Sequence, residues 1–109
     1  MAKDYTITFY RGNTKEITFL FINMPEYDSI QEVYFTIKDQ FEKNSQNGIT
    51  IRDYFAVLEL SEADTLLDIG SYKYDVQVNY TKDGKQHIYT LIPPSDLNVL
   101  KAIKVGGGM

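Results

Sequence analysis

The strongest constraint on the fold is an alternation of side chains in the stretch "GSYKYDVQVNYTKDGKQHIYTL", residues 70–91. Large side chains occupy every second position of its first half: Tyr72, Tyr74, Val76, Val78 and Tyr80. The intervening positions are polar. A period of two is typical of a β-strand, because successive side chains of a strand point to opposite faces of its sheet. The stretch therefore predicts two paired strands with one face on a core.

The Asp-Gly dipeptide at residues 83–84 predicts the turn between these two strands. A two-residue type I′ turn requires a positive φ at both central positions, which Asp and Gly adopt readily. Such a turn pairs Val78 with Tyr89. The next apolar pair is then Val76 with Leu91. A three-residue loop with a bulge at the glycine would instead shift the register by one residue, expose Tyr89 and lose the coincidence of apolar pairs.

Further strands follow the same period along the chain and are separated by turn-forming residues. The segment at residues 15–22 is apolar on both parities, so it is either covered on both faces or not a strand. Residues 40–48 are polar and predict a loop. Ser61, with Asp64 three residues later, predicts a helix N-cap and one short helical turn. The expected strands besides the hairpin are residues 6–10, 15–22, 31–39, 49–51, 54–60 and 97–105.

These elements predict an all-β fold of about seven to nine strands with one short helical turn. Parallel sheets need helical crossovers, and no stretch of the chain predicts a helix of useful length, so the sheets should be largely antiparallel. For 109 residues, we expect one antiparallel immunoglobulin-like β-sandwich at residues 1–105 and a flexible glycine-rich tail at residues 106–109. The expected core residues are Ile7, Phe9, Phe19, Val33, Phe35, Ile37, Leu58, Tyr72, Tyr74, Val76, Val78 and Leu91.

Charge and cysteine content exclude several classes of function. The net charge is −4 and the eleven Lys and Arg residues are spread along the chain, whereas binding to nucleic acid requires a clustered basic face. Without any Cys, the chain can form no disulfide, Cys-based zinc site or thiol nucleophile. The first residues lack the apolar stretch of a signal peptide, and no apolar run is long enough to cross a bilayer. We therefore expect synthesis in a bacterial cytoplasm and neither a nucleic-acid nor a membrane partner.

Residue types that carry catalysis are sparse. The single histidine, His87, has the parity of the core face, and we expect its ring to pack beside Tyr80 because no second ligand type lies nearby in the sequence. The serines lie in turns or at caps, without the glycines of a nucleophile elbow. Carboxylates gather around two loops without the spacing of a calcium loop: Asp39 and Glu42, then Glu59, Glu62 and Asp64. We predict no catalytic residue, no cofactor and no metal ligand.

The run "LELSEADTLLDIGSYKYDVQVNYTKDGKQHIYTL" resembles the immunoglobulin-like domain family of phage baseplate upper proteins and related prophage tail components. In that family, a strand ending in Leu leads to a Ser/Thr-acidic cap, a "G-x-Y-x-Y-D-[IV]" strand, a "D-G-x" hairpin and a "T-L" return strand. The matching residues are Leu60, Ser61, Asp64, Thr65, Gly70, Tyr72, Tyr74, Asp75, Val76, Asp83, Gly84, Thr90 and Leu91. Upstream, "RGNTKEITF" and "VYFTIKD" resemble two further strands of the family, whereas "IPPSDLNVLKAIKV" is longer than its final strand.

The resemblance implies a non-enzymatic structural or assembly module of a phage or prophage tail or baseplate, associated with the virion. Its expected partners are copies of itself, as a homo-oligomer, or other phage tail proteins. An alternative is a carbohydrate- or receptor-binding β-sandwich module, because aromatic rings stack on apolar patches of other molecules. The tyrosines that could form such a platform are Tyr10, Tyr27, Tyr34 and Tyr54.

Two segments are expected to form the interface with a partner. One parity of residues 17–22 exposes large apolar side chains unless another element covers it, and such patches usually mark interaction surfaces. Residues 97–105 are apolar, and Pro93 and Pro94 are expected to detach them from the hairpin, leaving an edge strand for pairing between subunits. The predicted interface residues are Leu20, Ile22, Tyr34, Tyr54, Leu97, Val99, Leu100 and Ile103.

Overall fold

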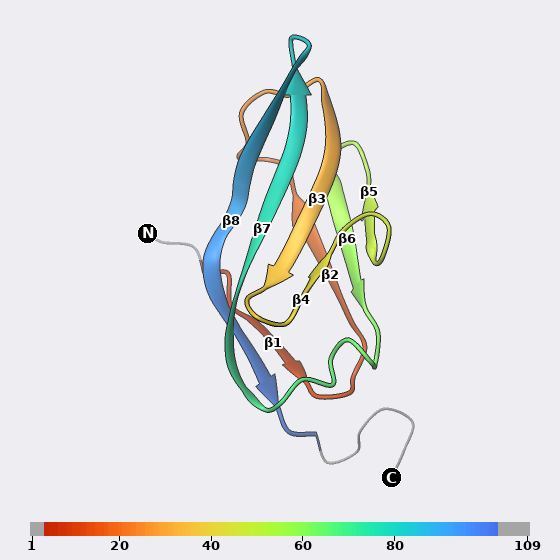
Figure 1. Cartoon of the computed structure of the whole chain (residues 1–109), viewed down its shortest axis with the longest axis vertical. Coiled ribbons are helices and arrows are strands. Elements are labelled where there is room, and N and C mark those ends of the chain that lie inside the picture. Colours follow the sequence, from red (N-terminus) through yellow and green to blue (C-terminus); the bar gives the residue numbers. More distant parts are fainter. Residues whose placement is uncertain (1–3, 103–109) are drawn as a thin grey trace.

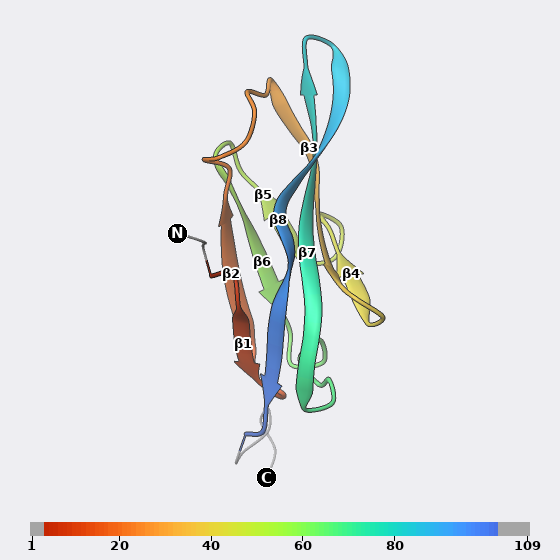
Figure 2. The same cartoon turned by 90° about the vertical axis from the view of Figure 1, so that its left-hand side faces the viewer.

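A computed structural model describes residues 4–102 and arranges them in two β-sheets that lie against each other (Figures 1 and 2). The five-stranded sheet contains, in spatial order, β1 (Ile7–Tyr10), β8 (Lys85–Leu100), β7 (Gly70–Lys82), β3 (Ser29–Ile37) and β4 (Phe41–Lys43). The three-stranded sheet contains β2 (Lys15–Leu20), β6 (Phe55–Leu60) and β5 (Ile49–Ile51). Since the described residues form no helix, the prediction of an all-β sandwich is confirmed.

The order of the strands is that of an immunoglobulin-like domain. The series β2-β6-β5 corresponds to strands B, E and D of that fold, and β8-β7-β3-β4 corresponds to G, F, C and C′. All pairs are antiparallel except β1 with β8, which run parallel from the Ile7–Leu97 pair to the Tyr10–Leu100 pair. The expected largely antiparallel sheets are thus found, with one parallel edge that the sequence pattern did not predict.

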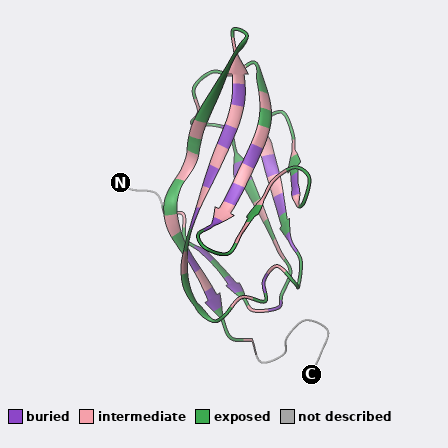
Figure 3. Cartoon of the chain, in the orientation of Figure 1, coloured by how far each residue is buried: buried purple, intermediate pink, exposed green. Residues whose placement is uncertain are grey.

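The alternation in β7 is the alternation of buried and outward-facing side chains (Figure 3). Tyr74, Val76 and Val78 are buried, as are Val33, Phe35 and Ile37 of the neighbouring β3. Aromatic rings join the two sheets, because Phe35 contacts Phe19 of β2, with ring centroids 6.2 Å apart. Within the five-stranded sheet, Phe35 also contacts Tyr74, with centroids 5.4 Å apart. The predicted core is confirmed except at two residues that are only partly buried against it: Tyr72 and Leu91.

The turn between β7 and β8 has the predicted type. Asp83 and Gly84 have φ values of 54° and 75°, as a two-residue type I′ turn requires. Val78 pairs with Tyr89, which confirms the preferred register near the turn. Farther along, Val76 pairs with Ile92 instead of Leu91, because a bulge inserts one extra residue into β8.

The proline pair does not separate the end of the chain from the hairpin, so this prediction is wrong. β8 is continuous from Lys85 to Leu100, and Tyr74 pairs with Ser95 just beyond the prolines. Pro93 and Pro94 lie in a second irregularity of the ladder, opposite Asp75. A bulge tolerates proline because its residues need not donate to the ladder, and the other edge of β8 is paired with β1 only from Leu97 onward.

Two local predictions also differ from the structure. The expected polar loop at residues 40–48 contains the short strand β4, which pairs with the end of β3 through Ile37 and Phe41. The expected short helical turn after Ser61 is a set of hydrogen-bonded turns at residues 62–65. Its predicted cap is nevertheless present, because the Ser61 N–H donates to the Asp64 carboxylate (2.8 Å) and the Asp64 N–H donates to the Ser61 hydroxyl (3.2 Å).

The segment before β1 is held by a buried phenol. The Tyr74 hydroxyl donates a hydrogen bond to the backbone carbonyl oxygen of Tyr5. Burial raises the pKa of Tyr74 to about 12, and nearby negative charge at Tyr5 and Asp4 acts in the same direction. The neutral form of Tyr74 is therefore part of the folded structure.

We expect Phe35→Ala to lower the free energy of unfolding by about 3–4 kcal/mol, because it removes a fully buried ring between the two sheets and leaves a cavity. Ile88→Ala, at an exposed position of β8, is the control and should change the free energy by less than about 0.5 kcal/mol. Urea denaturation measures both values. Equal losses for the two variants would contradict the placement of Phe35 in the core.

The folded chain should lose stability at alkaline pH through Tyr74. Its pKa of about 12 in the fold exceeds the ordinary value of 10.0, so above pH 10 the unfolded chain releases a proton that the folded chain retains. The free energy of unfolding therefore falls as the pH rises from 10 toward 12. Tyr74→Phe removes this contribution, and we expect a shallower decline in urea denaturation over that range. An unchanged decline would contradict the assignment.

Candidate functional site

The outer side of the three-stranded sheet carries apolar side chains, most of them at one end. Leu20 and Ile22 are 53% and 69% exposed. Phe19, which precedes Leu20, and Phe21, which lies between the two exposed residues, are buried in the core. The segment at residues 15–22 is thus covered on one face only, and its other parity faces outward. The predicted exposure of Leu20 and Ile22 is confirmed.

The strand registers arrange this outer face in three transverse rows. Leu20 lies opposite Phe55, and Phe55 lies opposite Arg52, whose N–H donates to the Phe55 carbonyl (2.8 Å). The next row has Thr18, Val57 and Thr50, and the last has Glu16 opposite Glu59. Residues directly opposite each other in a ladder share one face of the sheet. We call this surface the outer face and define it by Glu16, Thr18, Leu20, Thr50, Arg52, Phe55, Val57 and Glu59. Ile22 lies in the turn that follows β2.

Charges occupy the two ends of the outer face. Glu16 and Glu59 are both exposed and directly opposite each other, an arrangement of like charges that destabilises a sheet. Arg52 is exposed at the other end, beside Leu20 and Phe55 in its row. None of the ion pairs found among residues 4–102 involves these three side chains. The outer face thus carries Leu20 and Phe55 beside Arg52 at one end, Val57 between two threonines in its middle row, and the two glutamates at the other end.

The C-terminal interface prediction is largely wrong. Leu97 and Val99 are both fully buried, because β8 continues past the prolines and places them in the core opposite β1. Leu100 is exposed at the end of β8, as an interface residue would be. Ile103 lies outside the described residues, as does the predicted glycine-rich tail at residues 106–109.

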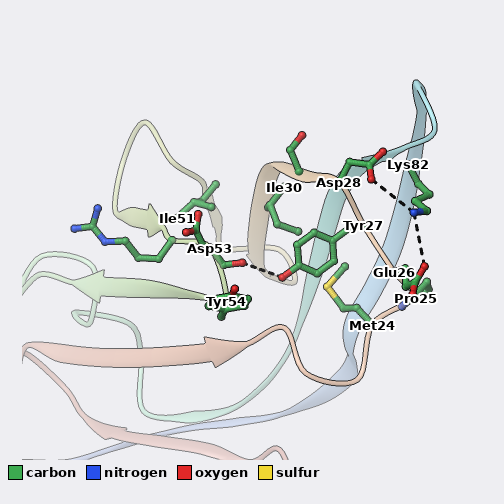
Figure 4. Close-up of a pocket in the computed structure, with 12 residues that line it drawn as sticks. Met24, Pro25, Glu26, Tyr27, Asp28, Ile30, Ile51, Asp53, Tyr54 and Lys82 are labelled. Atoms are coloured by element: carbon green, nitrogen blue, oxygen red, sulfur yellow. Dashed lines mark hydrogen bonds and ion pairs between the residues drawn. The ribbon is translucent and has the colours of Figure 1, made fainter.

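A second candidate site is a cleft at the end of the sandwich where the hairpin turn lies. Its volume is about 910 Å³, and Figure 4 shows several of its lining side chains. Tyr27 lies across the cleft and donates a hydrogen bond from its hydroxyl to the Asp53 carbonyl oxygen (2.9 Å). Burial raises the pKa of Tyr27, with smaller contributions from Tyr54 and Asp53. Tyr54, 76% exposed just before β6, is the second aromatic residue that lines this cleft.

The other side of this cleft is charged. Lys82 at the end of β7 forms ion pairs with Asp28 (3.6 Å) and Glu26 (3.7 Å), as Figure 4 shows. The neighbouring carboxylates of Asp28, Asp83 and Glu26 raise the pKa of Lys82, Asp28 most strongly. The Asp28 carboxylate also accepts the Asp83 N–H (2.8 Å), which ties the segment before β3 to the hairpin turn. The charged rim therefore has a structural role.

The four tyrosines proposed as a platform do not form one surface. Tyr27 and Tyr54 line the cleft together. Tyr34 borders a shallow hollow on the outer side of the five-stranded sheet, where Ile88 is also exposed. Tyr10 ends β1. Of these four tyrosines, only Tyr27 and Tyr54 could contact one small ligand. On the outer face, the sequence did not identify Arg52 or Glu16 as candidate site residues.

His87 and the loop carboxylates are not arranged as a catalytic or metal site among the described residues. The His87 ring stacks on Tyr80 as predicted, with centroids 5.1 Å apart and an interplanar angle of 18°. His87 is nevertheless exposed, because the hairpin extends beyond the three-stranded sheet (Figure 2). Within the described part of the chain, no group of three or more His, Asp or Glu side chains is arranged to hold a metal ion. The same residues include no helix long and apolar enough to span a membrane.

One predicted loop carboxylate stabilises the fold directly. Asp64, from the loop before β7, forms an ion pair of 2.9 Å with Lys43 of β4, and both side chains are largely shielded from solvent. Burial raises the pKa of Asp64, but hydrogen bonds from Ser61 and Lys43 and the Lys43 charge outweigh it, so the pKa lies below the ordinary 3.8. This pair holds the loop that leads to β7 against the five-stranded sheet.

Comparison with known proteins gives no relative for this chain: no protein-family model, no curated protein and no solved structure matches it. The resemblance to immunoglobulin-like domains of phage baseplate proteins therefore depends on the sequence motifs alone.

We expect Asp64→Asn to lower the free energy of unfolding by about 1 kcal/mol at pH 7, since it removes an ion pair and weakens a cap. The contribution of Asp64 is present above pH 3.8 and is lost as the pH falls through its lowered folded pKa. The difference in stability between wild type and variant should therefore shrink as the pH falls below 3.8. Urea denaturation at pH 7 and through the acidic range tests this, with Glu62→Gln as control. A loss that persists at the lower pH would contradict the electrostatic explanation.

Proposed function

We propose that the chain is a non-enzymatic assembly module that works by contact of its outer face with other proteins. The observation that carries this proposal is the exposure of Leu20 on that face, directly opposite Phe55, together with the exposure of Ile22 in the turn after β2. An antiparallel sheet that faces water on one side normally alternates apolar inward residues with polar outward ones. Apolar residues on the outward parity do not contribute to the core, and a partner that covers them gains their burial free energy.

The narrower form of the proposal is a structural component of a phage or prophage tail or baseplate. It is supported by the sequence resemblance, which covers roughly residues 10–92 and includes the Asp83–Gly84 hairpin and the strand from Gly70. Particles of this kind are built from many copies of small domains, so partners would be copies of the chain or other tail proteins. A module of this class needs no catalytic residue.

A second candidate, the carbohydrate- or receptor-binding module, is favoured by one observation. Tyr27 and Tyr54 line a single cleft, and Tyr54 exposes most of its ring at the mouth. Exposed aromatic faces beside carboxylates suit stacking on a sugar ring with hydrogen bonds at its edge. A glycan-array screen distinguishes the two candidates, because binding that is lost in Tyr54→Ala and retained in Leu20→Thr would favour the second.

The assembly function is tested by co-expressing the tagged chain with the proteins encoded next to its gene, and by measuring the mass of each complex by light scattering. We expect the chain to associate with itself or with a co-expressed tail protein. Leu20→Thr combined with Ile22→Thr should weaken this association at least about tenfold, because both side chains lose burial at the contact.

Ile88→Thr is the matched control, since it removes an equally exposed apolar side chain from the other sheet. This variant should associate as the wild type does. A wild-type chain that stays monomeric at its highest soluble concentration and binds none of the co-expressed proteins would contradict the proposed function.

A further inference from the structure

We propose that the open edge of β2, which borders the outer face, accepts an extended segment of a partner protein as an additional β-strand. The inference rests on the proposed function and names the surface and the chemistry of the partner: an extended backbone with apolar side chains at alternate positions. Such a strand would occupy the place that strand A has beside strand B in a constant-type immunoglobulin domain.

The first observation is the direction of the backbone groups of β2. Within the described part of the chain, β2 pairs with β6 only, and the Phe21 N–H donates to the Tyr54 carbonyl oxygen just beyond that ladder (3.0 Å). In an antiparallel ladder, residues that exchange hydrogen bonds alternate with residues whose N–H and C=O groups point the other way. Phe19 therefore bonds toward β6, as Phe21 does. The backbone groups of Thr18 and Leu20 point to the open edge.

The second observation is that β2 lacks the features that protect the other edges of the two sheets. The other terminal strands, β1, β4 and β5, have four, three and three residues, and a short edge strand offers few groups for pairing. The part of β8 that β1 does not cover contains Pro93 and Pro94, which have no N–H. β2 has six residues, a regular register and no proline. It is therefore the edge best suited to pairing.

The third observation is an apolar hollow beside this edge. Its volume is about 240 Å³, and it lies between β2 and β8, on the side of the sandwich that faces the viewer in Figure 2. Phe19, Leu20 and Ile22 line it on one side, and Leu91 and Ile92 of β8 line it on the other. Side chains of a strand alternate between the two faces of its sheet, so every second side chain of an added strand would enter this hollow.

Two hydrogen bonds hold the walls of the hollow in place. The Tyr89 hydroxyl donates to the Asn23 carbonyl oxygen (3.1 Å), which joins β8 to the turn after β2. The Tyr74 hydroxyl donates to the Tyr5 carbonyl oxygen. Asn23 and Tyr5 both line the hollow. The site is thus formed before a partner binds, which reduces the free energy that ordering the site would cost.

The open backbone groups identify the occupant. A small apolar molecule could fill the hollow, but it would leave the N–H and C=O groups of Thr18 and Leu20 without partners. An extended segment satisfies these groups and fills the hollow at the same time. Leu20 would also gain a neighbour on the outer face, because opposite side chains of two paired strands share one face. The contact therefore covers the edge of β2 together with an apolar side chain of the outer face.

A peptide that has only the stated chemistry tests the proposal. The capped peptide KVTVTVK carries valine at every second position and lysines at its ends for solubility. The matched control KVTPTVK has the same charge, but its central proline removes one N–H and interrupts pairing. We expect the chain to bind the first peptide at least about tenfold more tightly than the second, as measured by chemical-shift titration. Equal binding of the two peptides, or no binding in the millimolar range, would overturn the proposal.

Amide hydrogen exchange locates the bound peptide. The Thr18 and Leu20 amides should exchange rapidly in the free chain and more slowly with KVTVTVK bound, because the peptide accepts their hydrogen bonds. The Phe19 amide, which bonds toward β6, should exchange slowly in both states. Binding that leaves the exchange of Thr18 and Leu20 unchanged would place the peptide elsewhere and reject the β2 edge.

Thr18→Pro tests the edge by mutation. Proline removes the Thr18 N–H and places its ring at the open edge, and the ladder with β6 does not use that N–H. This variant should bind KVTVTVK at least about tenfold more weakly than the wild type. Thr18→Ala is the matched control, since it keeps the N–H, and it should bind as the wild type does. Urea denaturation checks that both variants fold. If Thr18→Pro does not fold, the exchange rates of the wild type decide.

Failure of this proposal is distinguishable from failure of the assembly function. A co-expressed tail protein that binds folded Thr18→Pro as tightly as the wild type would overturn the edge contact and leave the assembly function standing. A chain that associates neither with itself nor with any co-expressed protein would contradict the proposed function, whichever peptide it binds.

Discussion

The pairing of β7 on both of its sides is the constraint on which the rest of the structure depends. β7 pairs with β8 from Gly70 to Lys82 and with β3 from Tyr74 to Thr81. Because side chains alternate with a period of two, these registers fix which parity of each neighbour faces the core. A slip of one residue would turn Asp75 and Gln77 inward and Val76 outward. The second sheet then packs on this surface through Phe19 against Phe35.

Features that depend on local geometry were predicted from the sequence. The period of two in β7 and β3 follows from strand geometry alone, so their buried residues could be named without knowing their partners. The type I′ turn at Asp83 and Gly84 depends on the φ values of two adjacent residues. The same reasoning identified Leu20 and Ile22 of the candidate site, because an apolar run on both parities leaves one parity facing outward.

Features that depend on distant segments were missed or wrong. Leu97 and Val99 were assigned to an interface because a proline pair normally ends a strand, but the bulge opposite Asp75 and the late start of β1 allow β8 to continue. Nothing near residues 93–94 in the sequence indicates either condition. The rows of the outer face were missed for the same reason, because Glu59 lies opposite Glu16 only through the register of β2 with β6. A single sequence does not encode that register in a readable pattern.

The two sheets differ in the types of side chain on their outward faces. On the five-stranded sheet, the outward residues of β7 are polar, among them Asp75, Gln77 and Asn79, as expected for a surface in water. On the three-stranded sheet, the outward side chains of Leu20, Phe55 and Val57 contribute nothing to the core, and the like charges of Glu16 and Glu59 directly opposite each other destabilise the isolated fold. Only the inward-facing residues of this sheet contribute to the core, so the fold does not require apolar residues on its outward side. The proposed assembly function accounts for Leu20 and Phe55 on this face, because a partner that covered them would gain their burial free energy.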